Sequence, residues 1–239
     1  MLGAWSILHA TESLLAARFV SSLANTLAAN GKRVLLFDLS PECPALDILL
    51  GVDGRVVYTL CDIGRVPPCD VLLSPCKNLF FVPLGVGEQV EASKITAVTE
   101  AVTPDAVLFV TTRSTFTVAR SLSDGALLLT DPSPVALRAA SALTSANHFD
   151  GFVLTDFLPV REAVKGMPAL TEMADLLGIP LFGILPQTDL YNIHTVREKN
   201  FLTAIENMTG RLMGEAVPLL RGISIEGMRR KRFFTRISE

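Results

Sequence analysis

The chain has 239 residues and a formal net charge of −3 at pH 7, with 49% apolar and 19% charged residues. This composition predicts a folded domain with a large core and excludes intrinsic disorder. A chain with a slightly negative net charge does not attract nucleic acid over its whole surface, so we expect no nucleic-acid partner. No apolar run reaches the ~18 residues that a membrane-spanning helix needs.

The cysteines, at positions 43, 61, 69 and 76, have no C-x-x-C spacing. No basic segment precedes the first apolar residues, so the pattern does not indicate an export signal. We therefore expect reduced thiols in a cytoplasmic protein and no metal site.

The predicted elements begin with a short apolar strand at residues 5–9 and a helix at residues 12–29. Apolar residues that recur every four positions mark the buried stripe of the helix: Leu15, Phe19, Leu23 and Leu27. Gly31 ends this helix, and the unbroken apolar run at residues 34–37 is typical of a strand buried on both faces. Together these elements predict one β-α-β unit.

The rest of the chain continues the alternation of strands and helices. Further strands are predicted at residues 78–82, 106–110, 126–130, 151–155 and 181–185. Helices are predicted at residues 46–50, 56–63, 89–102, 132–147, 170–177 and 203–213. A loop with several prolines is predicted at residues 64–75. The alternation predicts an α/β fold, a doubly wound and mostly parallel sheet with helices on both faces.

Asp38 directly follows the apolar run at residues 34–37. Ligands of open α/β sheets bind at the carboxyl ends of the strands, so this acid is a candidate ligand-binding residue. The alternative is a loop-starting aspartate that caps local backbone groups.

The stretch at residues 31–51, GKRVLLFDLSPECPALDILLG, resembles the corresponding segment of the MinD/ParA family of P-loop ATPases. The resemblance extends over nearly the whole chain. It includes GRVVY at 54–58, NLFFVP at 78–83, LLLTDPSPVALRAA at 127–140, LLGIPLFGILP at 176–186 and GRLMGEAVPL at 210–219. It implies the P-loop ATPase fold, with ATP and magnesium as the family's cofactors.

The phosphate loop of that family does not match. A P-loop needs glycines whose amides wrap phosphate, a lysine that reaches the phosphate oxygens, and a hydroxyl that holds magnesium. The equivalent stretch at residues 10–18, ATESLLAAR, contains no glycine and no lysine. The positions of the family's lysine and threonine fall on Ala16 and Ala17, and Thr11 and Glu12 are candidates to satisfy the free amides of this helix N-terminus.

Two further family positions have changed. The second acid of the family's D-x-D pattern is Ser40 here, and the acid that ends the family's Walker B strand is Val110. Asp38 is the only retained family position. We therefore expect no catalytic residues, no metal ligands and no bound cofactor, and we interpret the chain as a pseudo-ATPase rather than an enzyme.

The last residues, EGMRRKRFFTRISE at 226–239, combine cations with bulky apolar side chains. On a helix, the apolar residues fall on one side, as in an interfacial membrane segment. The candidate membrane-binding residues are Arg229, Arg230, Lys231, Arg232, Phe233, Phe234, Arg236 and Ile237. The family ends in a similar amphipathic helix, and the alternatives are a disordered basic tail or one packed on the domain.

These observations divide the chain into one α/β domain at residues 1–222 and a membrane-targeting tail at residues 223–239. The resemblance implies a division-site or spatial-organisation regulator or scaffold, peripheral on the inner face of the cell membrane. Its expected partners are an anionic membrane surface and other proteins, including an intact MinD-like ATPase, in a homodimer or heterodimer. The alternatives are a functional ATPase with an atypical phosphate loop, using ATP and magnesium, and a soluble scaffold of polar or pilus assembly.

Overall fold

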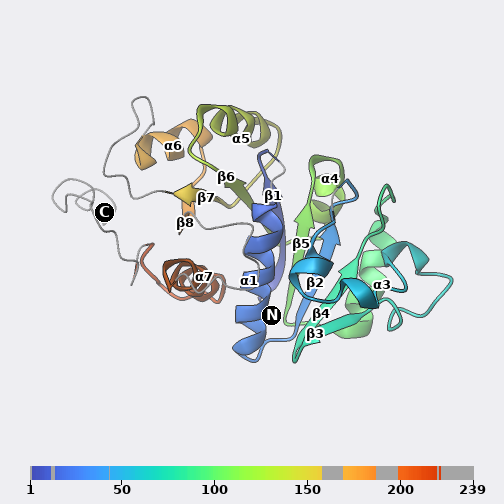
Figure 1. Ribbon diagram of the computed structural model, residues 1–239. Helices are drawn as coiled ribbons and strands as arrows, with labels where there is room; N and C mark the ends of the chain where they lie inside the picture. Colours follow the sequence, from blue (N-terminus) through green and yellow to red (C-terminus); the bar gives the residue numbers. More distant parts are fainter. Residues whose placement is uncertain are drawn as a thin grey trace.

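The computed structural model describes residues 2–11, 14–42, 44–157, 169–186, 199–219 and 221 (Figure 1). Its centre is one eight-stranded sheet with the order β3-β4-β2-β5-β1-β6-β7-β8. The strands are β1 Gly3–His9, β2 Val34–Leu39, β3 Leu73–Cys76, β4 Leu79–Pro83, β5 Ala106–Thr111, β6 Gly125–Thr130, β7 Gly151–Phe157 and β8 Leu181–Pro186. All neighbouring pairs are parallel except β3 with β4, which confirms the doubly wound α/β fold.

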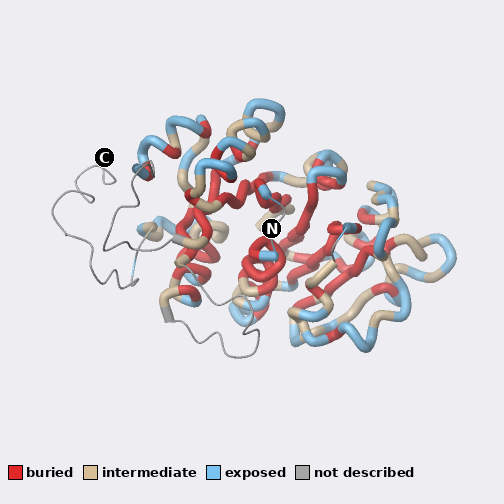
Figure 2. The backbone as a smooth tube through the Cα atoms, turned by 45° about the horizontal axis from the view of Figure 1, so that its top comes forward, coloured by how far each residue is buried: buried red, intermediate tan, exposed pale blue. Residues whose placement is uncertain are grey.

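Helices cover both faces of the sheet. The α-helices are α1 Leu15–Ala29, α2 Leu46–Leu49, α3 Ala92–Val102, α4 Arg113–Ser121, α5 Pro134–Ala146, α6 Leu170–Leu177 and α7 Lys199–Leu212. Helices α1 and α7 pack on one face, while α3, α4, α5 and α6 contribute to the apolar clusters of the other. In Figure 2 the central strands and the inner helix faces are buried, and the peripheral loops are exposed.

The core follows from the apolar periodicity of the chain. Phe19, Leu23 and Leu27 of α1 are fully or almost fully buried against the sheet, as their four-residue spacing predicts. Each such side chain contributes roughly 1.5–3 kcal/mol by leaving water. The central strands β2, β5 and β6 are buried along their whole length, because helices lie over both of their faces.

Two local predictions are wrong. The prolines of residues 64–75 predicted only a loop, yet β3 pairs antiparallel with β4 at the sheet edge, where Pro75 is tolerated because an edge strand has one unpaired side. The helix predicted at residues 56–63 is reduced to a 3-10 turn at Leu60–Asp62, whose first amide, Thr59 N, donates to the Asp62 carboxylate at 2.8 Å.

Helix α4 had no counterpart among the predicted elements. Its sequence, RSTFTVARS, is rich in β-branched and polar residues, which hide the apolar period. The signal that marks it is the capping pair at its start, where the Thr112 amide donates to Thr115 Oγ1 at 3.1 Å.

Candidate functional site

The carboxyl ends of strands β1, β2 and β5 meet at one edge of the sheet, where a ligand would bind in this architecture. The strand register places Ile7 of β1 and Asp38 of β2 on either side of Val110 of β5. The chain segments that follow these three strands therefore lie together at this edge (Figure 1).

Asp38 is buried and serves the backbone of the loop that follows it. Its side chain is 1% exposed. Oδ1 accepts the amide of Ser40 at 3.2 Å, and Oδ2 accepts the amides of Ala45 and Leu46, each at 3.1 Å. Burial raises the pKa of the Asp38 carboxyl, and these hydrogen bonds oppose the rise. This geometry matches the capping alternative, since the carboxylate holds the turn that leads into α2.

Val110 lies beside Asp38 as part of the apolar core. It is buried within the cluster that α1 forms with the sheet. A valine side chain has no atom that can bind a metal ion or hold a water molecule.

The turn after β1 is held by His9 and Arg113. The Thr11 amide donates to His9 Nδ1 at 3.2 Å, and the guanidinium of Arg113 donates to the carbonyl of Ala10 at 2.8 Å. Burial lowers the pKa of His9 to about 4, although the charge of Asp131 acts in the opposite direction. His9 Nε2 is buried and has no hydrogen-bond partner among the described residues.

Helix α1 begins with buried apolar side chains instead of phosphate-binding groups. Ala16 and Ala17 are both buried in its first turn and belong to the core cluster. The helix has no side-chain cap at Leu14. The Thr11 hydroxyl lies 3.2 Å from His9 Nδ1, and Glu12 is outside the described residues.

Arg18, one turn into α1, is a charged residue of this region that the sequence did not single out. Its guanidinium carbon lies 5.0 Å from the ring centroid of Phe201 in α7. Its charge also lowers the pKa of Asp156 at the end of β7, whereas burial and the charge of Asp131 raise that pKa more strongly. Arg18 lies beside the apolar stripe of the helix, and no sequence pattern indicated its contact with Phe201.

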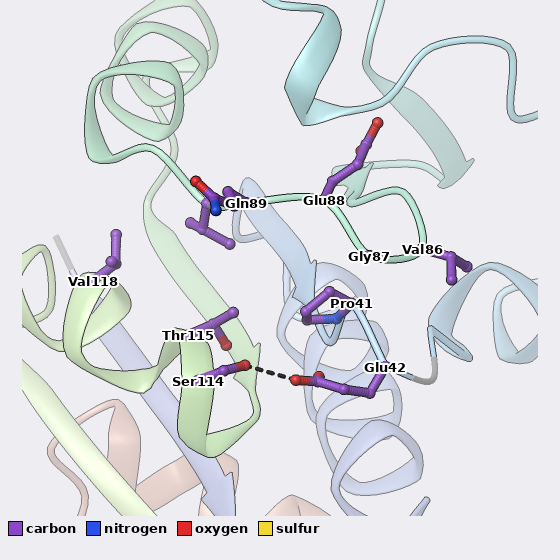
Figure 3. A pocket seen from close by; sticks show the side chains of 10 residues that line it. Pro41, Glu42, Val86, Gly87, Glu88, Gln89, Ser114, Thr115 and Val118 are labelled. Atoms are coloured by element: carbon purple, nitrogen blue, oxygen red, sulfur yellow. Dashed lines mark hydrogen bonds between the residues drawn. The ribbon is translucent and has the colours of Figure 1, made fainter.

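The loop after β2 is also held by hydrogen bonds from α4 and from the loop after β4. Ser114 Oγ of α4 donates to Glu42 Oε1 at 2.8 Å (Figure 3). Thr115 Oγ1 donates to the Leu39 carbonyl at 2.6 Å. The Gly87 amide, in the loop after β4, donates to the Pro41 carbonyl at 3.0 Å. Together with Asp38, these contacts tie the start of the loop to β4 and α4.

Comparison with known proteins shows which proteins the chain resembles. No protein-family model matches the sequence. The septum site-determining protein MinD of Thermotoga maritima is 24% identical over 230 residues, 83% of this chain and 83% of that protein. MinD of a Synechocystis species is 25% identical over 227 residues, 84% of this chain and 85% of that protein. The chain is similar to these MinD proteins along more than four fifths of its length.

The MinD/ParA fold is also found by structural comparison. The MinC:MinD cell division protein complex of Aquifex aeolicus contains a chain that superposes with a TM-score of 0.80 and 23% identity. The match covers 90% of this chain and 97% of that chain. This likeness shows the fold.

P-loop ATPases of the MinD/ParA family use ATP and magnesium, so the residues at this edge can be tested against that ligand. Magnesium needs hard oxygen ligands in addition to phosphate. Both oxygens of Asp38 accept backbone amides, Val110 offers no ligand atom, and Ala16 and Ala17 carry neither an ammonium nor a hydroxyl group. The described residues at these MinD/ParA positions do not fit magnesium-bound ATP.

The membrane-binding residues that were predicted in the tail, at 229–237, lie outside the described residues. Within the described part of the chain, no helix has both the length and the apolar character required to cross a membrane.

Proposed function

We propose that this chain is a MinD-like pseudo-ATPase, which regulates or scaffolds the placement of a division site or another spatial pattern without hydrolysing ATP. The observation that carries the proposal is the geometry of Asp38, the one retained family position. Its carboxylate is committed to three backbone amides in the core. Phosphoryl transfer depends on positioning and charge stabilisation, and a carboxylate held by backbone amides supplies neither to a nucleotide.

The sequence of the first β-α unit supports the same proposal. No glycine occurs between Gly3 and Gly31, and the first lysine of the chain is Lys32. A phosphate loop without glycine would place side chains where the backbone amides must approach the phosphates.

The fixed loop after β2 supports the absence of a nucleotide switch. A ligand shifts a conformational equilibrium only by its different affinity for two states. Here hydrogen bonds of Asp38, Ser114 and Gly87 hold the start of the loop, and a rearrangement of that segment would have to break them. We propose that the chain forms a constitutive homodimer or a heterodimer with an intact MinD-like ATPase.

Membrane association is proposed to depend on the basic tail. Cations near an anionic lipid surface each contribute about 1 kcal/mol, and the four consecutive cations at positions 229–232 are followed by Phe233 and Phe234. One short segment binds weakly, whereas two tails of a dimer bind more tightly through avidity. The protein would then be cytoplasmic and peripheral on the inner face of the cell membrane.

Co-sedimentation with lipid vesicles tests this proposal. The full-length chain is mixed with phosphatidylglycerol-containing vesicles, with and without magnesium and ATP. We expect equal sedimentation in both conditions, and loss of sedimentation with pure phosphatidylcholine vesicles. The combined substitution of alanine at positions 229–232 should reduce binding by at least about tenfold. Sedimentation that requires ATP would contradict the proposal.

A further inference from the structure

A cleft of about 670 Å³ opens beside the loop after β2. Its walls come from the loop after β2, the loop between β4 and α3, and the first half of α4 (Figure 3). The hydrogen bond between Ser114 and Glu42 joins two of these walls.

One part of the cleft lining is apolar. Pro41, Val90 and Val118 contribute aliphatic surface from three separate segments. Val86, at the same cleft, is 76% exposed, which leaves an apolar side chain in contact with water. Such surface suits the methylene stem of a long side chain.

The other part of the lining carries negative charge. The Glu42 carboxylate is exposed and oriented by the Ser114 hydroxyl. Glu88 Oε2 accepts the Gly85 amide at 2.7 Å and the Thr59 hydroxyl at 3.1 Å. Among the described residues that line the cleft there is neither a lysine nor an arginine.

The surrounding sequence extends this charge. Residues 41–91, which connect β2 to α3, contain seven acidic and three basic residues. A net negative segment with an aliphatic cleft favours encounter with a basic partner. The negative charge of the cleft selects for a basic ligand, which a purely apolar groove would not do.

We propose that this cleft binds an arginine side chain from a basic segment of a partner protein. The aliphatic stem of the arginine lies against Pro41, Val90 and Val118, and its guanidinium pairs with Glu42. Arginine fits better than lysine because its planar fork can engage a carboxylate through two hydrogen bonds and is less strongly hydrated. The site does not depend on the absence of ATP hydrolysis or on membrane binding.

Nuclear magnetic resonance titration of the full-length chain tests this site with a defined probe. N-acetyl-arginine amide is added at low salt, and N-acetyl-citrulline amide serves as the neutral probe of the same shape. We expect the arginine probe to shift the backbone amide signals of Gly87, Gln89 and Ser114, with a dissociation constant on the order of millimolar. The citrulline probe should produce much smaller shifts.

The substitution Glu42→Gln should weaken arginine binding by about threefold or more, as expected for loss of an exposed ion pair. Asp53→Asn is the matched control, because it removes one negative charge from the same acidic segment outside the cleft lining. It should leave the affinity unchanged. Equal responses to both probes, an unaffected Glu42→Gln variant, or equal weakening by Asp53→Asn would overturn the proposal.

Discussion

At the residue scale, Asp38 shows how a family position can persist with a structural role. An acid at the end of a buried strand costs free energy unless its oxygens are satisfied. The three amides of Ser40, Ala45 and Leu46 satisfy it, and two of these amides start the turn into α2. The residue type is therefore explained by the local fold, without a nucleotide.

Asp38→Ala should lower the free energy of unfolding by roughly 3 kcal/mol, because it leaves buried amides without acceptors. Asp38→Asn retains one acceptor oxygen and should cost less. Urea unfolding of the two variants and the wild type measures the difference. If Asp38→Ala were as stable as the wild type, the capping role would be wrong.

His9 should make stability depend on pH. Its pKa is about 4 in the folded protein against an ordinary value of 6.5, so between these values the unfolded chain binds more protons. The imidazole therefore does not lower the free energy of unfolding above pH 6.5. Below pH 6.5 the free energy of unfolding falls as the pH drops toward 4. The full loss is about 3 kcal/mol.

The comparison variant for this titration is His9→Asn, whose carbonyl can still accept the Thr11 amide. Asp38 and Asp156 have raised pKa values, so their carboxyls bind protons more tightly in the folded protein than in the unfolded chain. They therefore change the folding stability with pH in the opposite direction to His9, over an overlapping pH range. The difference between wild type and variant therefore isolates the imidazole. Parallel stability curves between pH 4 and 6.5 would show that His9 titrates normally.

At the element scale, the pairing of β1 with β6 depends on a glycine. The register places Gly125 opposite Trp5, and a Cβ atom at Gly125 would lie 2.5 Å from Trp5 Cζ3. Gly125→Ala should therefore lower the free energy of unfolding by about 1–3 kcal/mol through overpacking. Because Trp5 is the single tryptophan, its fluorescence reports both the unfolding and the displacement of the ring.

Gly54→Ala is the control for this substitution, since a Cβ atom at Gly54 has nothing within 4 Å. Its stability should stay within about 0.5 kcal/mol of the wild type. Equal stability of the Gly125 and Gly54 variants would mean that the ring of Trp5 moves aside without cost.

The elements also show what the sequence could predict. Strands buried on both faces, such as β2 and β5, are continuous apolar runs, and α1 has a regular stripe, so these elements were found within a few residues of their ends. Helix α4 and strand β3 were missed because their stability comes from capping and edge pairing rather than from an apolar period.

The candidate site was predicted in part: the position of Asp38 was found, but its long-range neighbours were not. The position of Asp38 at a strand end followed from the apolar run, and its capping role was one of two alternatives. The contacts of Ser114 with Glu42 and of Arg113 with Ala10 join residues 72 and 103 positions apart. Such pairs arise from strand order, which a local pattern does not contain.

At the scale of the whole molecule, the chain combines a MinD/ParA fold with a strand edge at which the described residues do not fit magnesium-bound ATP. The helices and strands that surround this edge are retained, while the groups that would hold phosphate and magnesium are absent from the described positions 14–18 and from Val110. Because fold alone does not fix function, the nucleotide chemistry has to be tested directly.

Isothermal titration calorimetry with magnesium and ATP on the full-length chain tests the pseudo-ATPase proposal most directly. We predict no binding heat above dilution at millimolar nucleotide. Binding with a micromolar dissociation constant would contradict the proposal and favour a functional ATPase like those of the MinD/ParA family.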